Sequence, residues 1–348
     1  MAQRPSTIRV YGPLPPPAVG LARVTAAVTA RVRERAADRT IVFDTGDGVP
    51  APLRLRRLLH GLASLLVARR RAGVVYVGGA GGELLWYQVL VVALARVAGH
   101  RVLFHHHNYS YLHEPSRAMA LLTRIGSTCT THVVLGETMA TDLRRLYPSA
   151  RDTLVCSNAG LLPAAEPGAR RERRGPVVLG HLSNLTVAKG VDVVLRLTRS
   201  LLDEGRDVRL VLAGPCLDDE AQALVDAAVH DLGDALEVTG PVPQDRVDEI
   251  YRRIDLFVFP SRYANETEPL VLLDGMRLGV PALAFDTGCV REVVGDDHVV
   301  APDGDFGALV RRHLDAGPEP AERVAARFTR RRDDALAAQE RLVDQIAG

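Results

Sequence analysis

The chain alternates short runs of apolar and β-branched residues with longer stretches of helical period, and this rhythm runs through most of its 348 residues. Helix-like stretches such as 19–37 and 53–71 separate the runs. The expected strands are 7–11, 40–44, 73–77, 101–106, 131–135 and 153–156 in the first half, then 177–182, 208–213, 236–239, 256–259 and 282–285. Such alternation predicts an α/β protein built from mostly parallel, doubly wound sheets.

The rhythm is interrupted over residues 162–175 (LPAAEPGARRERRG), where Pro, Gly and a charge run are typical of a linker. We therefore expect an N-terminal domain at 1–162, a linker at 163–175 and a C-terminal domain at 176–320. A charged C-terminal helix, 321–348, is placed so that it can pack back on the N-terminal domain. Ligands of doubly wound sheets bind at the carboxyl ends of the strands.

The bulk properties exclude several classes of protein. The net charge is +1, from 43 basic and 42 acidic residues, which argues against a nucleic-acid partner. The four cysteines are widely spaced, so a zinc site or a disulfide framework is not expected and a cytoplasmic location fits. The start of the chain lacks the apolar region of a signal peptide. The most apolar stretch, 84–98, is too short to span a membrane and is typical of a buried helix.

One lysine, Lys189, stands among 42 arginines, a bias that fits a GC-rich bacterial genome. It lies with Gly190 where the strand at 177–182 leads through a loop into an amphipathic helix. The N-terminus of a helix favours an anionic ligand, and a compact ammonium group does not interchange freely with a guanidinium at a phosphate site. Lys189 is thus a candidate phosphate-binding residue; a solvated surface lysine is the alternative.

A second segment, 259–294, carries acidic residues around the start of a helix. Glu266 and Glu268 lie in a loop, a helix is expected to begin near Pro269, and Asp274 lies on that helix. Carboxylates placed in this way can accept hydrogen bonds from sugar or ribose hydroxyls. An acidic helix start that complements the helix dipole is the alternative for Glu266 and Glu268.

Together the two segments resemble the donor half of family 4 glycosyltransferases, retaining enzymes of the GT-B fold that use nucleotide-activated sugars. The family's K-G element is matched by residues 183–190 (SNLTVAKG). Its E-x7-E element is matched by Glu266 and Asp274, followed by GVP at 279–281 and DTG at 286–288. VLAGP at 211–215 and TGPV at 239–242 resemble the strand ends beside the nucleotide base.

The resemblance implies a role for each matching residue. Lys189 would hold the donor diphosphate and stabilise its charge as it leaves, Glu266 would contact the donor sugar, and Asp274 would accept hydrogen bonds from the ribose. Asn184 stands where the family often has Arg, and Asp274 is one methylene shorter than the usual Glu. The other implied donor-binding residues are Thr267, Glu268, Pro269, Leu270, Gly214, Pro215 and Val242.

The N-terminal half would then bind the acceptor, with Gly20 at a helix start where backbone can approach a ligand. His107 and Asn108 align best with a family pair whose His reaches the donor sugar, and His105 is the alternative. The run of three histidines also raises the possibility of a metal site. Successive side chains of a strand point to opposite faces, so only His105 and His107 can share a face, and we expect no metal.

These features predict a retaining, metal-independent glycosyltransferase that moves a sugar from a nucleotide-diphosphate sugar to a glycan, glycolipid or small molecule, with no further cofactor. The alternatives are a sugar-nucleotide epimerase or phosphorylase on the same fold, and a non-catalytic partner protein. The basic amphipathic stretch 53–71 suits contact with an anionic membrane at the inner face. An ordinary core-facing helix with arginines at its ends is the alternative for that stretch.

Overall fold

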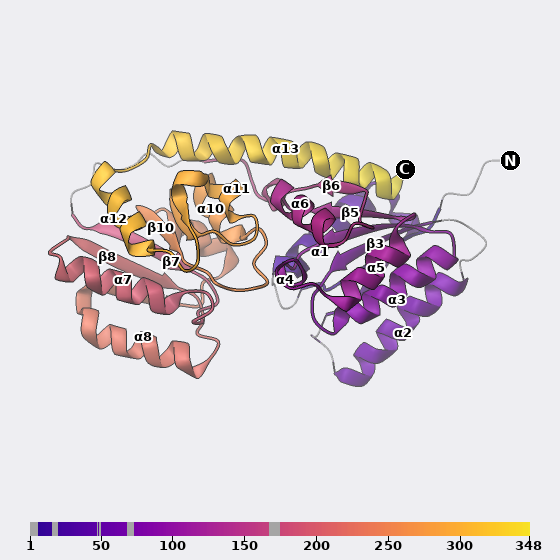
Figure 1. The fold of residues 1–348 in the computed structure, drawn as a ribbon, viewed down its shortest axis with the longest axis horizontal. Coiled ribbons are helices and arrows are strands. Elements are labelled where there is room, and N and C mark those ends of the chain that lie inside the picture. The colour runs from indigo at the N-terminus through magenta and orange to yellow at the C-terminus, as the bar shows by residue number, and fades with distance from the viewer. Residues whose placement is uncertain (1–5, 16–19, 47, 49, 68–72, 167–174) are drawn as a thin grey trace. The chain divides into compact units, whose positions relative to one another are not determined.

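The computed structural model describes residues 6–15, 20–46, 48, 50–67, 73–166 and 175–348. The chain divides into two compact units (Figure 1). Unit 1 comprises residues 1–161 together with 334–348, and unit 2 comprises residues 162–333. Each unit holds one six-stranded parallel sheet covered by helices.

The sheet of unit 1 has the strand order β2-β1-β3-β4-β5-β6. Its strands are β1 (Ile8–Gly12), β2 (Thr40–Asp44), β3 (Val74–Gly79), β4 (Arg101–His106), β5 (Thr130–Val134) and β6 (Thr153–Val155). Its helices are α1 (Gly20–Ala36), α2 (Ala51–Val67), α3 (Leu84–Val97), α4 (Ser110–His113), α5 (Arg117–Gly126) and α6 (Glu137–Leu146), with short 3-10 turns at Ala37–Arg39 and Asn158–Leu161.

The sheet of unit 2 has the strand order β9-β8-β7-β10-β11-β12. Its strands are β7 (Val177–Leu182), β8 (Val208–Ala213), β9 (Leu236–Gly240), β10 (Leu256–Phe259), β11 (Ala282–Phe285) and β12 (Val299–Val300). Its helices are α7 (Val191–Asp203), α8 (Asp219–Leu232), α9 (Val247–Tyr251), α10 (Leu270–Arg277), α11 (Val290–Val294) and α12 (Phe306–Ala316), with 3-10 turns at Gly233–Ala235, Gln244–Arg246 and Asp296–His298. The last helix, α13 (Ala321–Ala347), begins in unit 2 and ends in unit 1.

The doubly wound fold expected from the sequence is confirmed: each of the eleven expected strands is present, with ends shifted by no more than two residues. α10 begins directly after Pro269, as expected, and Pro269 is its N-cap. One expectation needs correction. The stretch 84–98 is not a wholly buried helix, because α3 exposes Trp86, Leu90 and Val97 along one side.

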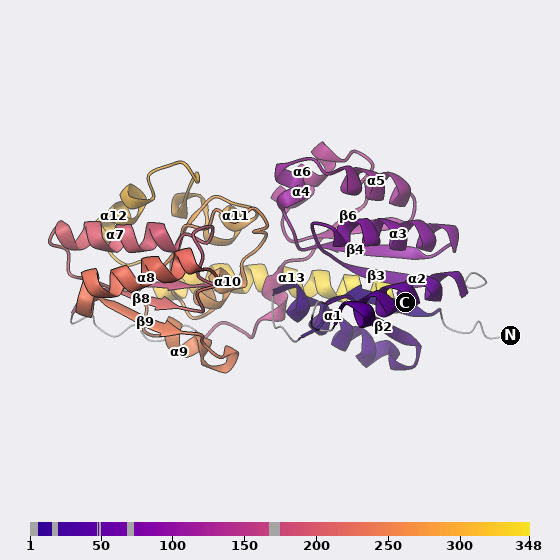
Figure 2. The ribbon, with the colours of Figure 1, turned by 90° about the horizontal axis from the view of Figure 1, so that it is seen from below.

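The cores follow from the apolar faces of the helices. In unit 2, α7, α8 and α12 pack on one face of the sheet through residues such as Leu195, Val225 and Leu309. In unit 1, the end of α13 joins the core that α1 forms with β1 and β3, through Ala338, Leu342, Val343 and Ile346. The C-terminal part of α13 therefore belongs to the unit 1 core, and Figure 2 shows its end close to α1.

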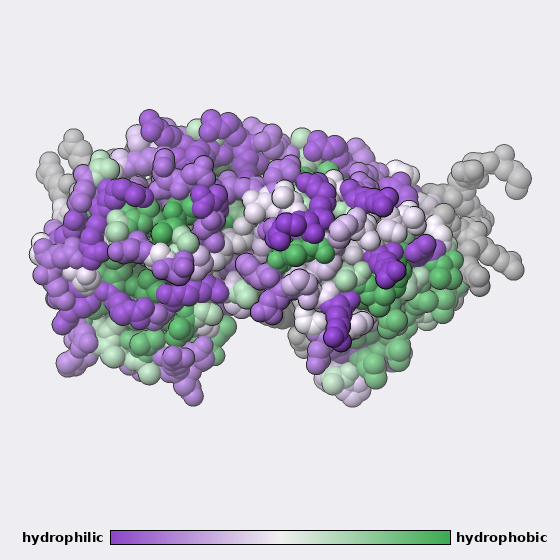
Figure 3. Space-filling view, in the orientation of Figure 1, coloured by the Kyte–Doolittle hydropathy of each residue, from purple (hydrophilic) through white to green (hydrophobic). Residues whose placement is uncertain are grey.

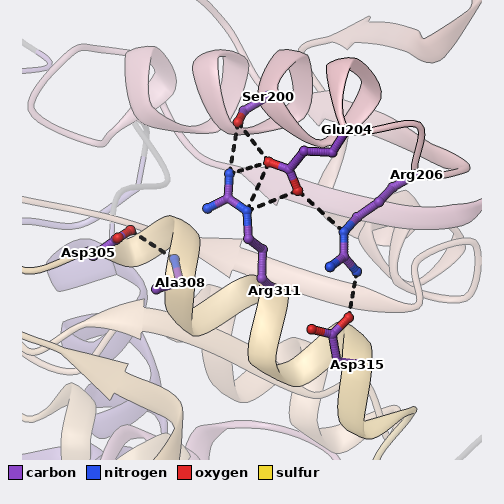
Figure 4. Close-up of polar contacts among 7 residues, drawn as sticks. All are labelled: Ser200, Glu204, Arg206, Asp305, Ala308, Arg311 and Asp315. Carbon is purple, nitrogen blue, oxygen red and sulfur yellow. Dashed lines mark hydrogen bonds and ion pairs between the residues drawn. The ribbon is translucent and has the colours of Figure 1, made fainter.

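A polar network ties the end of α7 to α12 in unit 2 (Figure 4). The Arg311 guanidinium donates hydrogen bonds to the Glu204 carboxylate and to Ser200 Oγ, and it lowers the pKa of Glu204 to about 2. Arg206 bridges to Asp315, while Asp305 accepts a hydrogen bond from Ala308 N and caps α12. The loop at 303–305 is thus a helix-capping turn.

Candidate functional site

The strand order of unit 2 places a crevice between β7 and β10. These strands are parallel neighbours, but the chain proceeds from β7 outward to β8 and from β10 outward to β11, in opposite directions across the sheet. The loops that follow such a pair of strands diverge, which leaves space for a ligand at their carboxyl ends. Lys189 follows β7 and Glu266 follows β10, so both lie in loops at this point.

Backbone contacts hold these two loops together. Arg262 N donates a hydrogen bond of 2.7 Å to the carbonyl of Ala188. Gly190, which caps α7, has a φ of +86°, and a Cβ there would lie 2.2 Å from the carbonyl oxygen of Pro260. Only glycine permits this approach, so the Lys-Gly pair has a structural reason beside its chemical one.

The side chains of Lys189 and Glu266 meet in this crevice. Lys189 Nζ lies 2.5 Å from Glu266 Oε2, and Ser261 Oγ donates to the same oxygen at 2.9 Å. The ammonium also lies 4.5 Å from the ring centroid of Tyr263. The side chain of Lys189 is 20% exposed and that of Glu266 10%, so the pair is shielded but can be reached from solvent. An anionic ligand can compete with Glu266 for Lys189 here.

His181, within β7, was not identified from the sequence. Its Nδ1 lies 2.9 Å from the carbonyl of Val258 and its Nε2 lies 2.9 Å from Ser183 Oγ. Burial lowers the pKa of His181 to about 4, so the ring is neutral at pH 7. Because a carbonyl only accepts, Nδ1 must donate and Nε2 must accept from Ser183. His181 thereby links β7 to β10. In the sequence, a polar residue within an apolar strand is the signal that could have identified it.

The expected donor-binding residues after Glu266 are buried. Thr267 accepts a hydrogen bond from Cys289 N through its carbonyl oxygen, and the Glu268 carboxylate contacts Arg331. Pro269 is also buried and Leu270 half-buried, at the start of α10, whose first N–H groups have no partner within the helix. Asp274 is buried on α10, and its charge contributes to raising the pKa of Tyr251, behind the larger effect of burial.

The other expected donor-binding residues lie in loops at the same edge of the sheet. Gly214 follows β8 with a φ of +121°, and a Cβ there would lie 1.8 Å from the carbonyl oxygen of Ser183. Pro215 accepts a hydrogen bond from Leu185 N through its carbonyl oxygen. Val242 is half-buried after β9, and Asn184 is exposed in the loop between β7 and α7.

In unit 1, the three histidines alternate as expected. His105 and His107 share one face, with ring centroids 4.1 Å apart, and His105 Nδ1 lies 2.8 Å from the hydroxyl of Tyr76. Burial lowers the pKa of His107 to about 3 and that of His105 well below its usual value. Within the described residues, Nε2 of each ring is buried without a hydrogen-bond partner. Both rings are therefore neutral and have an unused nitrogen.

His106 lies on the opposite face, where it contacts Tyr111 Oη at 2.9 Å and His132 Nδ1 at 3.0 Å. Asn108 turns the chain after β4, because its Oδ1 accepts from the amide and the hydroxyl of Ser110. Gly20 is the first residue of α1, and a Cβ there would meet nothing within 4 Å, so steric crowding does not require glycine. Among the described residues, no group of three His, Cys, Asp or Glu side chains is arranged to hold a metal ion.

The sequence matches to known proteins differ between the two units. Residues 165–325, nearly all of unit 2, match the family Glycosyl transferases group 1. D-inositol 3-phosphate glycosyltransferase of Streptosporangium roseum is 32% identical over 219 residues, which cover 58% of this chain and 48% of the relative. The amylovoran biosynthesis glycosyltransferase AmsK of Erwinia amylovora is 28% identical over 142 residues, or 38% of this chain and 34% of the relative. The chain thus spans about half the length, or less, of these curated relatives.

Solved structures extend the likeness to both units at the level of the fold. HepE of Anabaena, in complex with UDP, has a TM-score of 0.71 at 14% identity, with 98% of this chain and 99% of that chain covered. The lipopolysaccharide outer core galactosyltransferase WaaB has a TM-score of 0.72 at 15% identity, with 97% and 99% covered. Residues 165–325 therefore resemble the glycosyl transferases group 1 family, and the whole chain has the GT-B fold.

Proposed function

We propose that the protein is a retaining glycosyltransferase that moves a sugar from a nucleotide-diphosphate sugar to a glycan, glycolipid or small molecule. The observation that carries this proposal is the Lys189–Glu266–Ser261 cluster at the crevice of unit 2. The family of residues 165–325 supports the reaction, and the UDP complex of HepE supports a nucleotide sugar as donor. The AmsK relative supports a role in polysaccharide or glycoconjugate biosynthesis.

In this proposal the donor diphosphate takes the place of Glu266 as the partner of Lys189. The freed Glu266 carboxylate then accepts hydrogen bonds from the donor sugar. When the bond from the anomeric carbon to the phosphate oxygen breaks, negative charge builds on the leaving diphosphate. An acceptor hydroxyl bonds to the anomeric carbon on the same face, and its proton passes to the departing phosphate oxygen. The fixed ammonium of Lys189 and the first N–H groups of α10 stabilise that charge without reorganisation, which is commonly the largest contribution to catalysis.

Asp274 completes the donor site by accepting hydrogen bonds from the ribose, and the loops at Gly214, Pro215 and Val242 line the base. Asn184 can donate a hydrogen bond to phosphate but adds no charge, so Lys189 carries more of the diphosphate charge than in relatives with an arginine there. In unit 1, neutral His107, with His105 behind it, offers an uncharged ring nitrogen to a sugar hydroxyl. Gly20 and Asn108 belong to the loops proposed for the acceptor or phosphate.

Nucleotide binding tests the donor site directly. Thermal unfolding is measured with UDP, GDP and ADP; a ligand at 100 times its Kd should stabilise the folded state by about 2.7 kcal/mol. Lys189→Ala should abolish that stabilisation, whereas Arg199→Ala, an exposed cation on α7, should keep it. No stabilisation by any of the three nucleotides would contradict the proposal. Turnover of a sugar nucleotide without an acceptor would favour the epimerase or phosphorylase instead.

We further propose that unit 1 contacts an anionic membrane through a surface wider than the 53–71 stretch. Leu55, Leu59 and Leu66 of α2 are each more than half exposed, and so are Trp86, Leu90 and Val97 of the adjacent α3. Figure 3 shows the resulting apolar surface over these helices. α2 and α3 together contain four arginines and no acidic residue, in a chain of net +1.

Apolar side chains flanked by arginines suit the interface of an anionic bilayer. In the described residues, no helix is long and apolar enough to cross one. Trp86 is the single tryptophan of the chain, so its fluorescence reports on this surface alone. Vesicles of phosphatidylcholine with phosphatidylglycerol should shift its emission to the blue, and vesicles of phosphatidylcholine alone should not. Leu90→Glu should abolish cosedimentation with the anionic vesicles. Equal loss with Leu217→Glu, an exposed leucine of unit 2, would contradict the proposal.

A further inference from the structure

The segment 266–270, which carries the proposed sugar and phosphate contacts, is held from one side by the turn after β11. Cys289 N donates a hydrogen bond of 2.8 Å to the carbonyl of Thr267. Gly288 has a φ of +56°, and a Cβ there would lie 2.4 Å from the carbonyl oxygen of Glu266. This turn fixes the backbone before Glu268 and leaves the position of the Glu268 side chain to another contact.

That contact is Arg331 of α13. Its Nε donates to Glu268 Oε1 at 2.7 Å, and its Nη2 lies 2.6 Å from the same oxygen. Nη1 reaches the carbonyl of Glu292, on α11, at 3.4 Å. The Glu268 side chain is fully buried and that of Arg331 is 18% exposed. A buried carboxylate without its cation would be strongly unfavourable, so this pair helps to hold the Glu268 side chain in place.

The Glu268 carboxylate is anchored to α13 by its pair with Arg331. The residues on either side of Glu268 supply the proposed donor contacts. Glu266 lies two residues before it, and α10 begins two residues after it. Movement of Glu268 would displace both the sugar-binding carboxylate and the first N–H groups of α10.

We propose that Arg331 is a positioning residue for the donor diphosphate. It does not touch the ligand; it fixes Glu268, and through it the backbone from Glu266 to Leu270, beside Lys189. This inference rests on the proposed function for the identity of the ligand. Val324 and Phe328 of the same helix are fully buried, so the element that holds the loop is itself anchored.

Nucleotide affinity separates positioning from simple stabilisation. The Kd values of UDP, GDP and ADP are measured calorimetrically for the full chain and its variants, alongside the Tm of each without ligand. Arg331→Gln should raise the Kd of the nucleotide at least tenfold, and Arg331→Lys, which keeps the charge, should recover part of the lost affinity. Arg330→Gln changes the exposed neighbour on the same helix and should leave the Kd unchanged.

The double variant Glu268→Gln with Arg331→Gln leaves no unpaired buried charge, so it decides the matter if Arg331→Gln alone does not fold. It too should bind the nucleotide at least tenfold more weakly. A lower Tm with wild-type nucleotide affinity in the folded variants would overturn the positioning role and leave the proposed function intact. A wild-type chain that binds none of the three nucleotides would instead remove the proposed function, and this inference with it.

Discussion

The two units share the same architecture but differ in where they place polar groups. Each is a six-stranded parallel sheet covered by helices. Unit 2 places opposite charges at the carboxyl ends of its strands, and Lys189 and Glu266 pair there in a shielded crevice. Unit 1 buries neutral histidines at the end of β4 and exposes apolar residues on α2 and α3. A charged ligand thus suits unit 2, whereas unit 1 suits hydroxyl groups and an apolar surface.

A fall in pH should change stability more than any of the substitutions below, because the buried histidines are distributed unequally between the two units. Burial lowers the pKa of five histidines of unit 1, at 100, 105, 106, 107 and 132, against two of unit 2, His181 and His298. A lowered pKa in the folded state means that the unfolded state takes up protons first as the pH falls below about 6.5. Each such histidine then lowers the free energy of unfolding by about 1.4 kcal/mol per pH unit.

We therefore expect unit 1 to lose stability before unit 2 between pH 7 and pH 5. Amide hydrogen exchange followed by mass spectrometry, with peptides from β4 and β5 compared with peptides from β7 and β10, measures the two units separately. Earlier loss of protection in unit 2, or equal loss in both, would show that the buried histidines do not distinguish the units.

The next effect concerns the charge pair of unit 2. Lys189→Ala should lower turnover at least a hundredfold, since removal of one group that stabilises developing charge costs on the order of 3–4 kcal/mol. Glu266→Ala should have an effect of similar size. The control is Arg124→Ala, which removes an exposed cation of unit 1 on α5. The effect is measured as steady-state rates with sugar nucleotides of the nucleoside diphosphate that stabilises the protein in the thermal test. Near-normal rates in both variants would refute the assignment of the site.

The smallest effect tests the close approach of the two loops in unit 2. Gly190→Ala should destabilise the fold by on the order of 1–3 kcal/mol, from a strained φ of +86° and a Cβ too close to the Pro260 carbonyl. Gly205→Ala is matched in φ, at +78°, but a Cβ there meets nothing within 4 Å. Chemical denaturation of both variants isolates the steric part. Equal losses would mean that the loops can separate without cost.

Much of the fold could be read from the sequence because strands and helices have different apolar periods. The strands 40–44, 101–106, 177–182, 208–213, 256–259 and 282–285 were predicted to the residue. The two-residue β12 was missed because so short a run carries no periodicity. The apolar composition of α3 predicts a buried helix, but composition does not reveal which side a neighbouring helix covers.

The candidate donor residues can be found in the sequence alone, because Lys189 is the single lysine and the spacing between Glu266 and Asp274 follows a family pattern. Which of them meet depends on how the chain folds. Lys189 and Glu266 are 77 residues apart in the sequence, and the strand order brings their side chains together. The contact of His181 with Val258 depends on the strand order in the same way. The partner of Glu268 lies 63 residues away on α13. Local patterns cannot encode such pairs, because they arise only when the sheet and its covering helices are assembled.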